Sequence, residues 1–356
     1  NANTHWLYPT SEETDALIAA SRTTLAEFLG ASADEIAFGA NMTTLMFHVA
    51  RAIGRTLERG DEIIVTELDH HANIAPWQAL AQERGAVLKW IPLDLHTSHL
   101  DFDAYARALS PRTRVVAIGA ASNALGTISD VRSLIAMAKQ TGAITVVDAV
   151  HYAPHHLVDV RAIDCDFLAC SAYKFYGPHI GVLYGKAERI AALDVPRLEP
   201  SPNVGSERLE TGTQNHEGIV GAAAAVDFIA SLAAAESRSR RQRIAATFDA
   251  LHHRGEQLVA QLWDGIGRMP WVTPVGPLPG SSRTATVSMK VRGGSDAAAR
   301  ALAARGLFAS NGDFYASTVA RRLGVQDEGL LRIGCMAYTT DREIDRLLAA
   351  LHDLRS

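Results

Sequence analysis

Two polar side chains follow two apolar runs that lie close together in the sequence. The run Ile144–Val147 is short and rich in β-branched residues, as in a strand buried on both faces, and it ends at Asp148. The run Phe167–Cys170 is followed by Lys174. Strands of an open α/β sheet present their functional groups at their carboxyl ends, so this aspartate and lysine can face one ligand. A lysine that forms an imine with a carbonyl cofactor, and an aspartate that keeps a pyridine nitrogen protonated, are the pair that pyridoxal phosphate (PLP) chemistry requires.

An earlier turn has the pattern of a phosphate site. The stretch NMTTLMFHVARAIG begins with small polar residues and becomes apolar at helical spacing, which predicts a helix that starts near Thr43. The first turn of a helix has free backbone N–H groups and the positive end of the helix dipole. An ordinary helix cap gives the same pattern, and the turn by itself favours that interpretation.

Strands and helices alternate along most of the chain. This pattern predicts an α/β fold whose mostly parallel sheet is flanked by helices on both faces. The predicted strands are 35–39, 63–65, 87–91, 115–118, 144–147 and 167–170, and the helices between them begin near 43 and 76 and span 102–109 and 131–140.

The chain length predicts two domains. At about 150 residues per domain, 356 residues suit a large domain over 1–235, and a connecting helix with a smaller α+β domain over 236–356. An Ala-rich helical stretch begins near residue 221, and short strands alternate with helices after residue 272.

Composition excludes several classes of function. With 34 Lys+Arg against 39 Asp+Glu, the net charge of −5 gives no electrostatic case for binding nucleic acid. No apolar run approaches the roughly 18 residues that span a bilayer, so we expect no membrane partner. Three cysteines in apolar surroundings predict neither a disulfide framework nor a metal site, and they suit a reducing cytoplasm. No glycine-rich nucleotide motif follows an early strand, which disfavours a nucleotide-binding enzyme.

Several segments together resemble one family. VVDAVHYAPHHLVDVRAIDCDF and SAYKFYGPHIGVLYG, which carry Asp148 and Lys174, are similar to the aspartate and lysine segments of the cysteine desulfurase and class V aminotransferase family. TELDHHANIAPWQ, ASNALGT, RLETGTQN and RIGCMAYTTDREIDRLL match the same family in the expected order. The resemblance implies the fold of PLP-dependent transferases of fold type I. It also implies that an amino-terminal strand is missing before Asn1.

The resemblance assigns roles to individual residues. Lys174 forms the imine and then serves as the base, Asp148 bonds the pyridine nitrogen, and His70 stacks on the cofactor ring and relays protons. The implied cofactor-binding residues are Met42, Thr43, His70, Asn123, Asp148, His151, Ser171, Tyr173, Lys174 and Thr213. The implied substrate-binding residues are Arg332, which clamps the α-carboxylate, together with His5 and Asn123. Thr213 reaches the phosphate of the partner subunit, which implies a homodimer.

Three positions depart from the family pattern. Desulfurases carry a mobile cysteine on a loop of the small domain, and that position falls near Tyr315 in a segment without cysteine. His151 stands where the family usually has Gln, and because histidine titrates near neutrality we expect it to tune the imine. Tyr173 stands where desulfurases commonly carry His. The chain therefore resembles a branch of the family that lacks the loop cysteine.

The sequence leaves several functions open. We expect an enzyme that acts on an α-amino acid with desulfurase-like or C–S lyase chemistry and without a persulfide cysteine. A class V aminotransferase needs the same groups, and an amino-acid epimerase needs a second proton donor, for which Tyr315 or His5 is available. A non-catalytic binding protein is a further alternative, which the presence of Lys174, Asp148, Asn123 and Arg332 disfavours.

Overall fold

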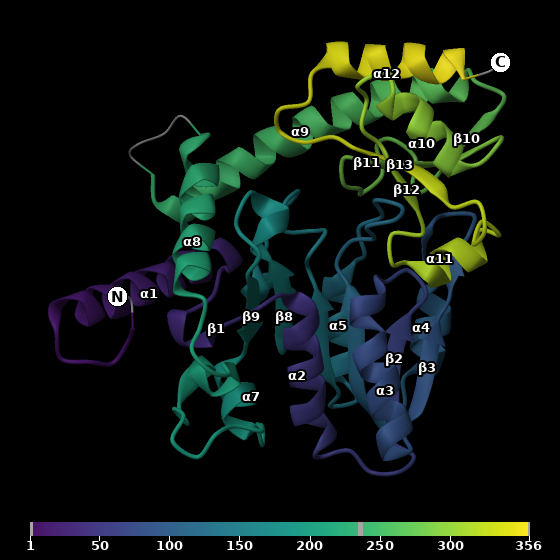
Figure 1. Ribbon diagram of the computed structural model, residues 1–356. Helices are drawn as coiled ribbons and strands as arrows, with labels where there is room; N and C mark the ends of the chain where they lie inside the picture. The colour runs from purple at the N-terminus through teal and green to yellow at the C-terminus, as the bar shows by residue number, and fades with distance from the viewer. Residues whose placement is uncertain (1–2, 234–237, 355–356) are drawn as a thin grey trace.

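The computed structural model describes residues 3–233 and 238–354, and its larger domain is built on a seven-stranded sheet (Figure 1). The strand order is β1-β9-β8-β7-β6-β2-β3, and only β9 runs antiparallel to its neighbours. The strands are β1 (Ile36–Gly39), β2 (Glu62–Thr66), β3 (Val87–Ile91), β6 (Thr113–Gly119), β7 (Ile144–Asp148), β8 (Phe167–Ser171) and β9 (Gly181–Gly185). The predicted α/β fold with a mostly parallel sheet is confirmed, although the sequence does not predict β9.

Helices cover both faces of this sheet because alternate strand residues point to opposite sides. Along β6, Val115 and Ala117 join one hydrophobic core, whereas Val116 and Ile118 join the other. The first core is covered by α2 (Met42–Gly54), α3 (Ala75–Arg84) and α7 (Ala187–Ala192). The second is covered by α1 (Pro9–Leu29), α4 (Phe102–Ala108), α5 (Val131–Lys139), α6 (Val160–Ile163) and α8 (His216–Ser231).

A smaller domain has a sheet and a core of its own. Its antiparallel sheet has the order β10-β11-β13-β12, with β10 (Val272–Val275), β11 (Thr286–Val291), β12 (Ser310–Gly312) and β13 (Leu330–Gly334). Its helices are α10 (Ser295–Ala303), α11 (Ser317–Arg322) and α12 (Asp341–Asp353). The long helix α9 (Arg240–Gly267) joins the domains, because Phe248 packs in the large core and Leu262 in the small one (Figure 1). The predicted boundary at 235/236 lies outside the described residues.

The remaining elements are short. A two-stranded hairpin of β4 (Leu93–Asp94) and β5 (His99–Leu100) follows β3. Among the described residues, every helix is too short or too polar to span a lipid bilayer.

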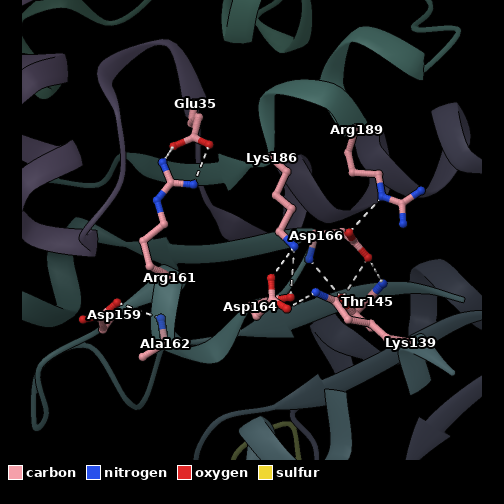
Figure 2. Close-up of polar contacts among 10 residues, drawn as sticks. All are labelled: Glu35, Lys139, Thr145, Asp159, Arg161, Ala162, Asp164, Asp166, Lys186 and Arg189. Atoms are coloured by element: carbon pink, nitrogen blue, oxygen red, sulfur yellow. Dashed lines mark hydrogen bonds and ion pairs between the residues drawn. The ribbon is translucent and has the colours of Figure 1, made fainter. Parts of the chain in front are cut away.

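Ion pairs and hydrogen bonds hold the amino-terminal edge of the large sheet together. Asp166, just before β8, accepts hydrogen bonds from the backbone N–H (2.8 Å) and the hydroxyl (2.9 Å) of Thr145 on β7 and from Arg189 (2.8 Å), as Figure 2 shows. Lys186, just after β9, pairs with the exposed Asp164 at 2.5 Å. These contacts join the ends of three strands at the edge opposite to Asp148.

Removing the buried carboxylate of this network will destabilise the large domain. Asp166→Ala leaves the buried N–H and hydroxyl of Thr145 without an acceptor, so we expect the free energy of unfolding to fall by about 2–4 kcal/mol. The matched control is Asp164→Asn, since the Asp164 side chain is 58% exposed against 1% for Asp166. Asparagine tolerates the left-handed backbone of residue 164, with φ of 61°, so loss of the charge will cost less than about 1 kcal/mol. Urea unfolding followed by circular dichroism measures both, and equal costs would contradict this account.

Candidate active site

Lys174 and Asp148 lie at the carboxyl ends of the adjacent strands β8 and β7. Lys174 is on a 3₁₀ turn, Ala172–Phe175, that ends at Tyr176, which has a left-handed backbone with φ of 71°. The Lys174 side chain is open to solvent, yet partial desolvation and the nearby Arg332 lower the pKa of its ammonium, while Asp148 opposes this shift. The direction of the shift favours the neutral amine, which is the nucleophilic form.

Asp148 is a buried carboxyl group. One of its oxygens accepts a hydrogen bond of 2.8 Å from the backbone N–H of Val150. Its pKa is raised to about 7, because burial and the nearby Asp69 outweigh the opposing effects of the Val150 N–H and of Lys174. Because burial penalises the charged form, a donor or a cation at this carboxyl would be strongly stabilising.

Asp69 is a second buried acid that the sequence analysis does not identify. Its carboxylate accepts hydrogen bonds from Thr66 (2.7 Å), Asn73 (2.7 Å) and the backbone N–H of Gly119 (2.9 Å). Burial raises its pKa to about 6. Gly119 is the register partner of Asp148 at the end of β6, and a Cβ on Gly119 would lie 2.9 Å from the Asp69 carboxylate. The signal in the sequence was an acid just after β2, in a place like that of Asp148.

His70 is held as a neutral ring beside the lysine. Its Nδ1 accepts the backbone N–H of Ala72 at 3.0 Å, so the hydrogen of the neutral ring is on Nε2. Burial lowers its pKa to about 4, and the nearby cation Lys174 contributes. The ring centroid lies 5.6 Å from that of Tyr315. His70 can therefore donate a hydrogen bond through Nε2 at neutral pH.

His151 connects the two domains. Its Nε2 lies 3.1 Å from the hydroxyl of Thr284 and 3.2 Å from that of Thr286 on β11. Burial, with His155 and Arg332 nearby, lowers its pKa well below the ordinary value. The expectation that His151 titrates near neutrality is therefore wrong, because the buried ring stays neutral at pH 7.

Arg332 and Asn123 come together where the domains meet. Arg332, on β13, donates to the backbone oxygen of Asn123 at 2.7 Å, and burial lowers its pKa. The Asn123 amide nitrogen donates to the backbone oxygen of Phe314 at 2.8 Å. The buried Asn123 Oδ1 has no hydrogen-bond partner in the described part of the chain. This oxygen is a place for a donor from a bound molecule.

The start of α2 lies against the end of β8. The backbone N–H of Met42 donates to the Ser171 hydroxyl at 3.0 Å. The helix starts at Met42, one residue before the predicted Thr43, and the Thr43 side chain is exposed. This close approach needs Gly181 on β9, because a Cβ there would lie 2.5 Å from the backbone of Asn41. Ser171 accepts in this bond, which leaves its hydroxyl hydrogen for another acceptor.

Tyr173, Thr213 and His5, three further residues of the predicted site, are exposed to solvent. Tyr173 is 41% exposed, stacks on His179 at 4.7 Å, and has the Lys174 Nζ 5.0 Å from its ring centroid. Thr213 is exposed before α8. His5 is exposed, and its backbone N–H donates to the carboxylate of Asp15 on α1 at 3.0 Å. In the described chain, no contact joins Thr213 or His5 to Lys174.

No cluster of three or more His, Cys, Asp or Glu residues suited to a metal ion occurs among the described residues. The structure thus brings together Lys174, Asp148, His70, Arg332 and Asn123 at one edge of the sheet.

Comparisons with known proteins identify the family and the fold of this chain. The family model for class V aminotransferases matches residues 1–347. A cysteine desulfurase of Pectobacterium carotovorum is 33% identical over 97% of this chain and 84% of its own length. An aminotransferase-like protein of Gibberella zeae is 32% identical over the same shares of the two chains. A solved cysteine desulfurase of Thermococcus onnurineus, in its apo form, has a TM-score of 0.90 and 29% identity over 99% of this chain and 87% of its own.

The buried acid at the site predicts a pH-dependent stability in the protein without cofactor. The folded pKa of Asp148 is raised from 3.8 to about 7, so its contribution is fully present near pH 4 and is lost as the pH rises through 7. Asp148→Asn mimics the protonated acid, and we expect it to become more stable than wild type by up to ~4 kcal/mol between about pH 4 and pH 8. Urea unfolding across this range measures the difference, and a gap that does not change with pH would refute the assignment.

Proposed function

The chain belongs to the class V aminotransferase family of PLP-dependent enzymes, and on that premise we propose that it cleaves a C–S bond of an α-amino acid without an enzyme-bound persulfide. The three cysteines carry this proposal. Cys165, Cys170 and Cys335 are all buried, with at most 3% of their surface exposed. Burial raises the pKa of each thiol, that of Cys335 to about 11. A buried thiol with a raised pKa is a poor nucleophile, because the thiolate is the reactive form.

The residues of the site fit PLP. The buried carboxyl of Asp148 has a raised pKa and suits a protonated ring nitrogen, which would supply the missing donor. The free hydroxyl hydrogen of Ser171 and the amino-terminal end of α2 suit a phosphate group. The second amide hydrogen of Asn123 suits the phenolic oxygen. When bound, PLP supplies an aldehyde that joins an amine and a ring that accepts electrons.

Each residue then has a defined task. Arg332 binds the substrate carboxylate, since a planar guanidinium matches two carboxylate oxygens. Lys174 removes the proton from Cα, and the downward shift of its pKa favours the neutral base. His70 remains neutral because its pKa is about 4, and its Nε2–H is available to donate a hydrogen bond to the bound substrate or cofactor.

The overall reaction balances without an oxidant or a reductant. For an S-substituted cysteine, the Cα–H and Cβ–S bonds break, and the sulfur leaves as a thiol with one proton. The remaining carbon skeleton takes up one water and yields pyruvate and ammonia. Transamination instead yields a keto acid with no loss of sulfur, and epimerisation yields only the other enantiomer.

We further propose a homodimer in the cytoplasm, in which Thr213 completes the site of the partner. The support is that Thr213 is exposed and has no contact with Lys174 in the described part of its own chain. Three free buried cysteines are typical of a reducing compartment.

Product analysis tests the reaction directly. We expect PLP-loaded protein to release thiol, pyruvate and ammonia in equal amounts from S-substituted cysteines, because Lys174 and the ring suffice for elimination. Lys174→Ala will lose at least about 10³-fold in rate, whereas Cys335→Ala will keep the wild-type rate. Alanine from cysteine, with its sulfur held as a persulfide that an added thiol reductant releases as sulfide, and loss of this activity in Cys335→Ala, would support a persulfide route instead. A keto acid that retains sulfur would support an aminotransferase. Failure to bind PLP would support a non-catalytic binding protein.

Subunit mixing tests the role of Thr213. Thr213→Val lowers the affinity for PLP if the hydroxyl bonds the phosphate, and Lys174→Ala inactivates its own site. If Thr213 acts in the partner's site, a mixed dimer of the two variants contains one fully wild-type site and one doubly altered site. At a PLP concentration that saturates wild type but not Thr213→Val, mixing the two impaired preparations will then restore activity towards half of the wild-type level in each mixed dimer. No recovery, with mixed dimers demonstrated by mass spectrometry, would place Thr213 in its own subunit's site.

A further inference from the structure

The segment Asp313–Ala316, named here the lid, joins β12 to α11 and has an unusual backbone. Phe314 and Tyr315 both have φ of 57°. Two consecutive large residues in the left-handed region are uncommon, and such a conformation persists only where the surroundings enforce it. The contacts of the lid should therefore identify what enforces it.

Two backbone oxygens of the lid are bound by the large domain. The oxygen of Phe314 accepts from the Asn123 amide at 2.8 Å, and that of Tyr315 accepts from the backbone N–H of His71 at 2.7 Å. Within the lid, the carboxylate of Asp313 accepts the N–H of Tyr315 at 3.0 Å. The left-handed turn thus points consecutive carbonyl groups at the active-site edge of the sheet.

The helix after the lid is also anchored to the large domain. Arg322, at the end of α11, pairs with Glu67 at 3.0 Å and donates to the backbone oxygen of Leu93 at 3.1 Å. Figure 1 shows α11 beside the ends of β2 and β3. The lid is therefore docked along its length on the large domain.

The ring of Phe314 fixes the plane of the carboxylate-binding arginine. The Arg332 guanidinium carbon lies 4.1 Å from the ring centroid, within the range of a cation–π contact. One guanidinium nitrogen already donates to the backbone oxygen of Asn123. One face and one nitrogen are thus engaged, which leaves the remaining N–H groups in a defined plane for a carboxylate.

Tyr315 presents an aromatic surface at the mouth of the site. It is 74% exposed, and its ring lies 5.6 Å from that of His70 at an angle of 33°. His70 in turn lies near enough to Lys174 for the cation to lower its pKa. Tyr315 also directly follows Phe314, whose ring lies 4.1 Å from the guanidinium carbon of Arg332, the residue assigned to the substrate carboxylate.

We propose that the docked lid selects the substrate. Phe314 is a positioning residue that orients Arg332, and Tyr315 packs against the substrate side chain, so that the site prefers α-amino acids with an apolar or aromatic side chain, including S-alkyl and S-aryl cysteines, over small ones. This inference rests on the proposed function for the sulfur substrates only. Covering an apolar substituent with an aromatic ring removes its surface from water, which supplies the preference.

Binding of unreactive amino acids tests the lid independently of C–S cleavage. L-Phenylalanine and L-alanine have no leaving group on Cβ, and the absorbance of PLP-loaded protein reports their binding. We expect wild type to bind phenylalanine about tenfold more tightly than alanine. Tyr315→Asn, which tolerates the left-handed backbone, will bring this ratio close to one, and Tyr315→Phe will preserve it. An unchanged ratio in Tyr315→Asn would overturn the role of Tyr315.

The role of Phe314 has a different signature. Phe314→Leu will weaken the binding of phenylalanine and of alanine by a similar factor. For a cleaved S-substituted cysteine, it will raise KM more than it lowers kcat. Phe314→Tyr will bind both amino acids like wild type. The matched control is Phe308→Leu in the same domain, since Phe308 is 91% exposed. In protein without cofactor, hydrogen exchange at the His71 amide will be faster in Phe314→Leu only. Unchanged exchange and binding would overturn the role of Phe314.

The two proposals fail in different ways. If phenylalanine binds tightly through Tyr315 but S-benzylcysteine is not cleaved, the C–S lyase function is wrong and the lid inference stands. If S-benzylcysteine is cleaved but the variants bind both amino acids like wild type, the lid inference is wrong and the function stands.

Discussion

The electrostatics of the site depend on two buried carboxyl groups on either side of Gly119. Without a side chain at this glycine, Asp69 approaches the end of β6, next to Asp148 on β7. Burial raises the pKa of both acids, and Asp69 raises that of Asp148 further. Asp69 has three hydrogen-bond donors and Asp148 has the N–H of Val150. The arrangement therefore concentrates the need for a further donor on Asp148, for which we propose the ring nitrogen of PLP.

The two edges of the large sheet divide stability from function. At the amino-terminal edge, the buried carboxylate of Asp166 has partners from two other elements, so its burial is compensated. At the carboxyl edge, the buried Asn123 side-chain oxygen has no hydrogen-bond partner among the described residues, and Tyr176, Phe314 and Tyr315 have left-handed backbones. Unsatisfied and strained groups persist only where the rest of the fold holds them, and they gather at functional sites. Asp164 at the opposite edge also has a left-handed backbone, with φ of 61°, but it is exposed and pairs with Lys186.

The parts of the site that the sequence predicts are those encoded locally. Asp148 and Lys174 follow apolar runs whose length and composition indicate strands, and parallel strands bring their carboxyl ends together. The bonds of His151 to Thr284, and the stacking of Phe314 on Arg332, join different structural elements, and no local pattern marks them. The prediction for His151 was wrong for this reason. A solvent-exposed histidine titrates near neutrality, whereas His151 is buried between the two domains and its pKa is lowered.

A docked lid and a mobile nucleophile make opposite demands on the same segment. A persulfide mechanism needs a thiol that approaches the substrate and then withdraws to deliver its sulfur. In this chain, Asn123 and His71 bind successive carbonyl groups of the corresponding segment, and Arg332 stacks on its ring. Withdrawing the segment would break these contacts and release the arginine that is assigned to the substrate carboxylate. Substrate binding and lid docking therefore favour each other, which suits a reaction whose sulfur product leaves as a small molecule.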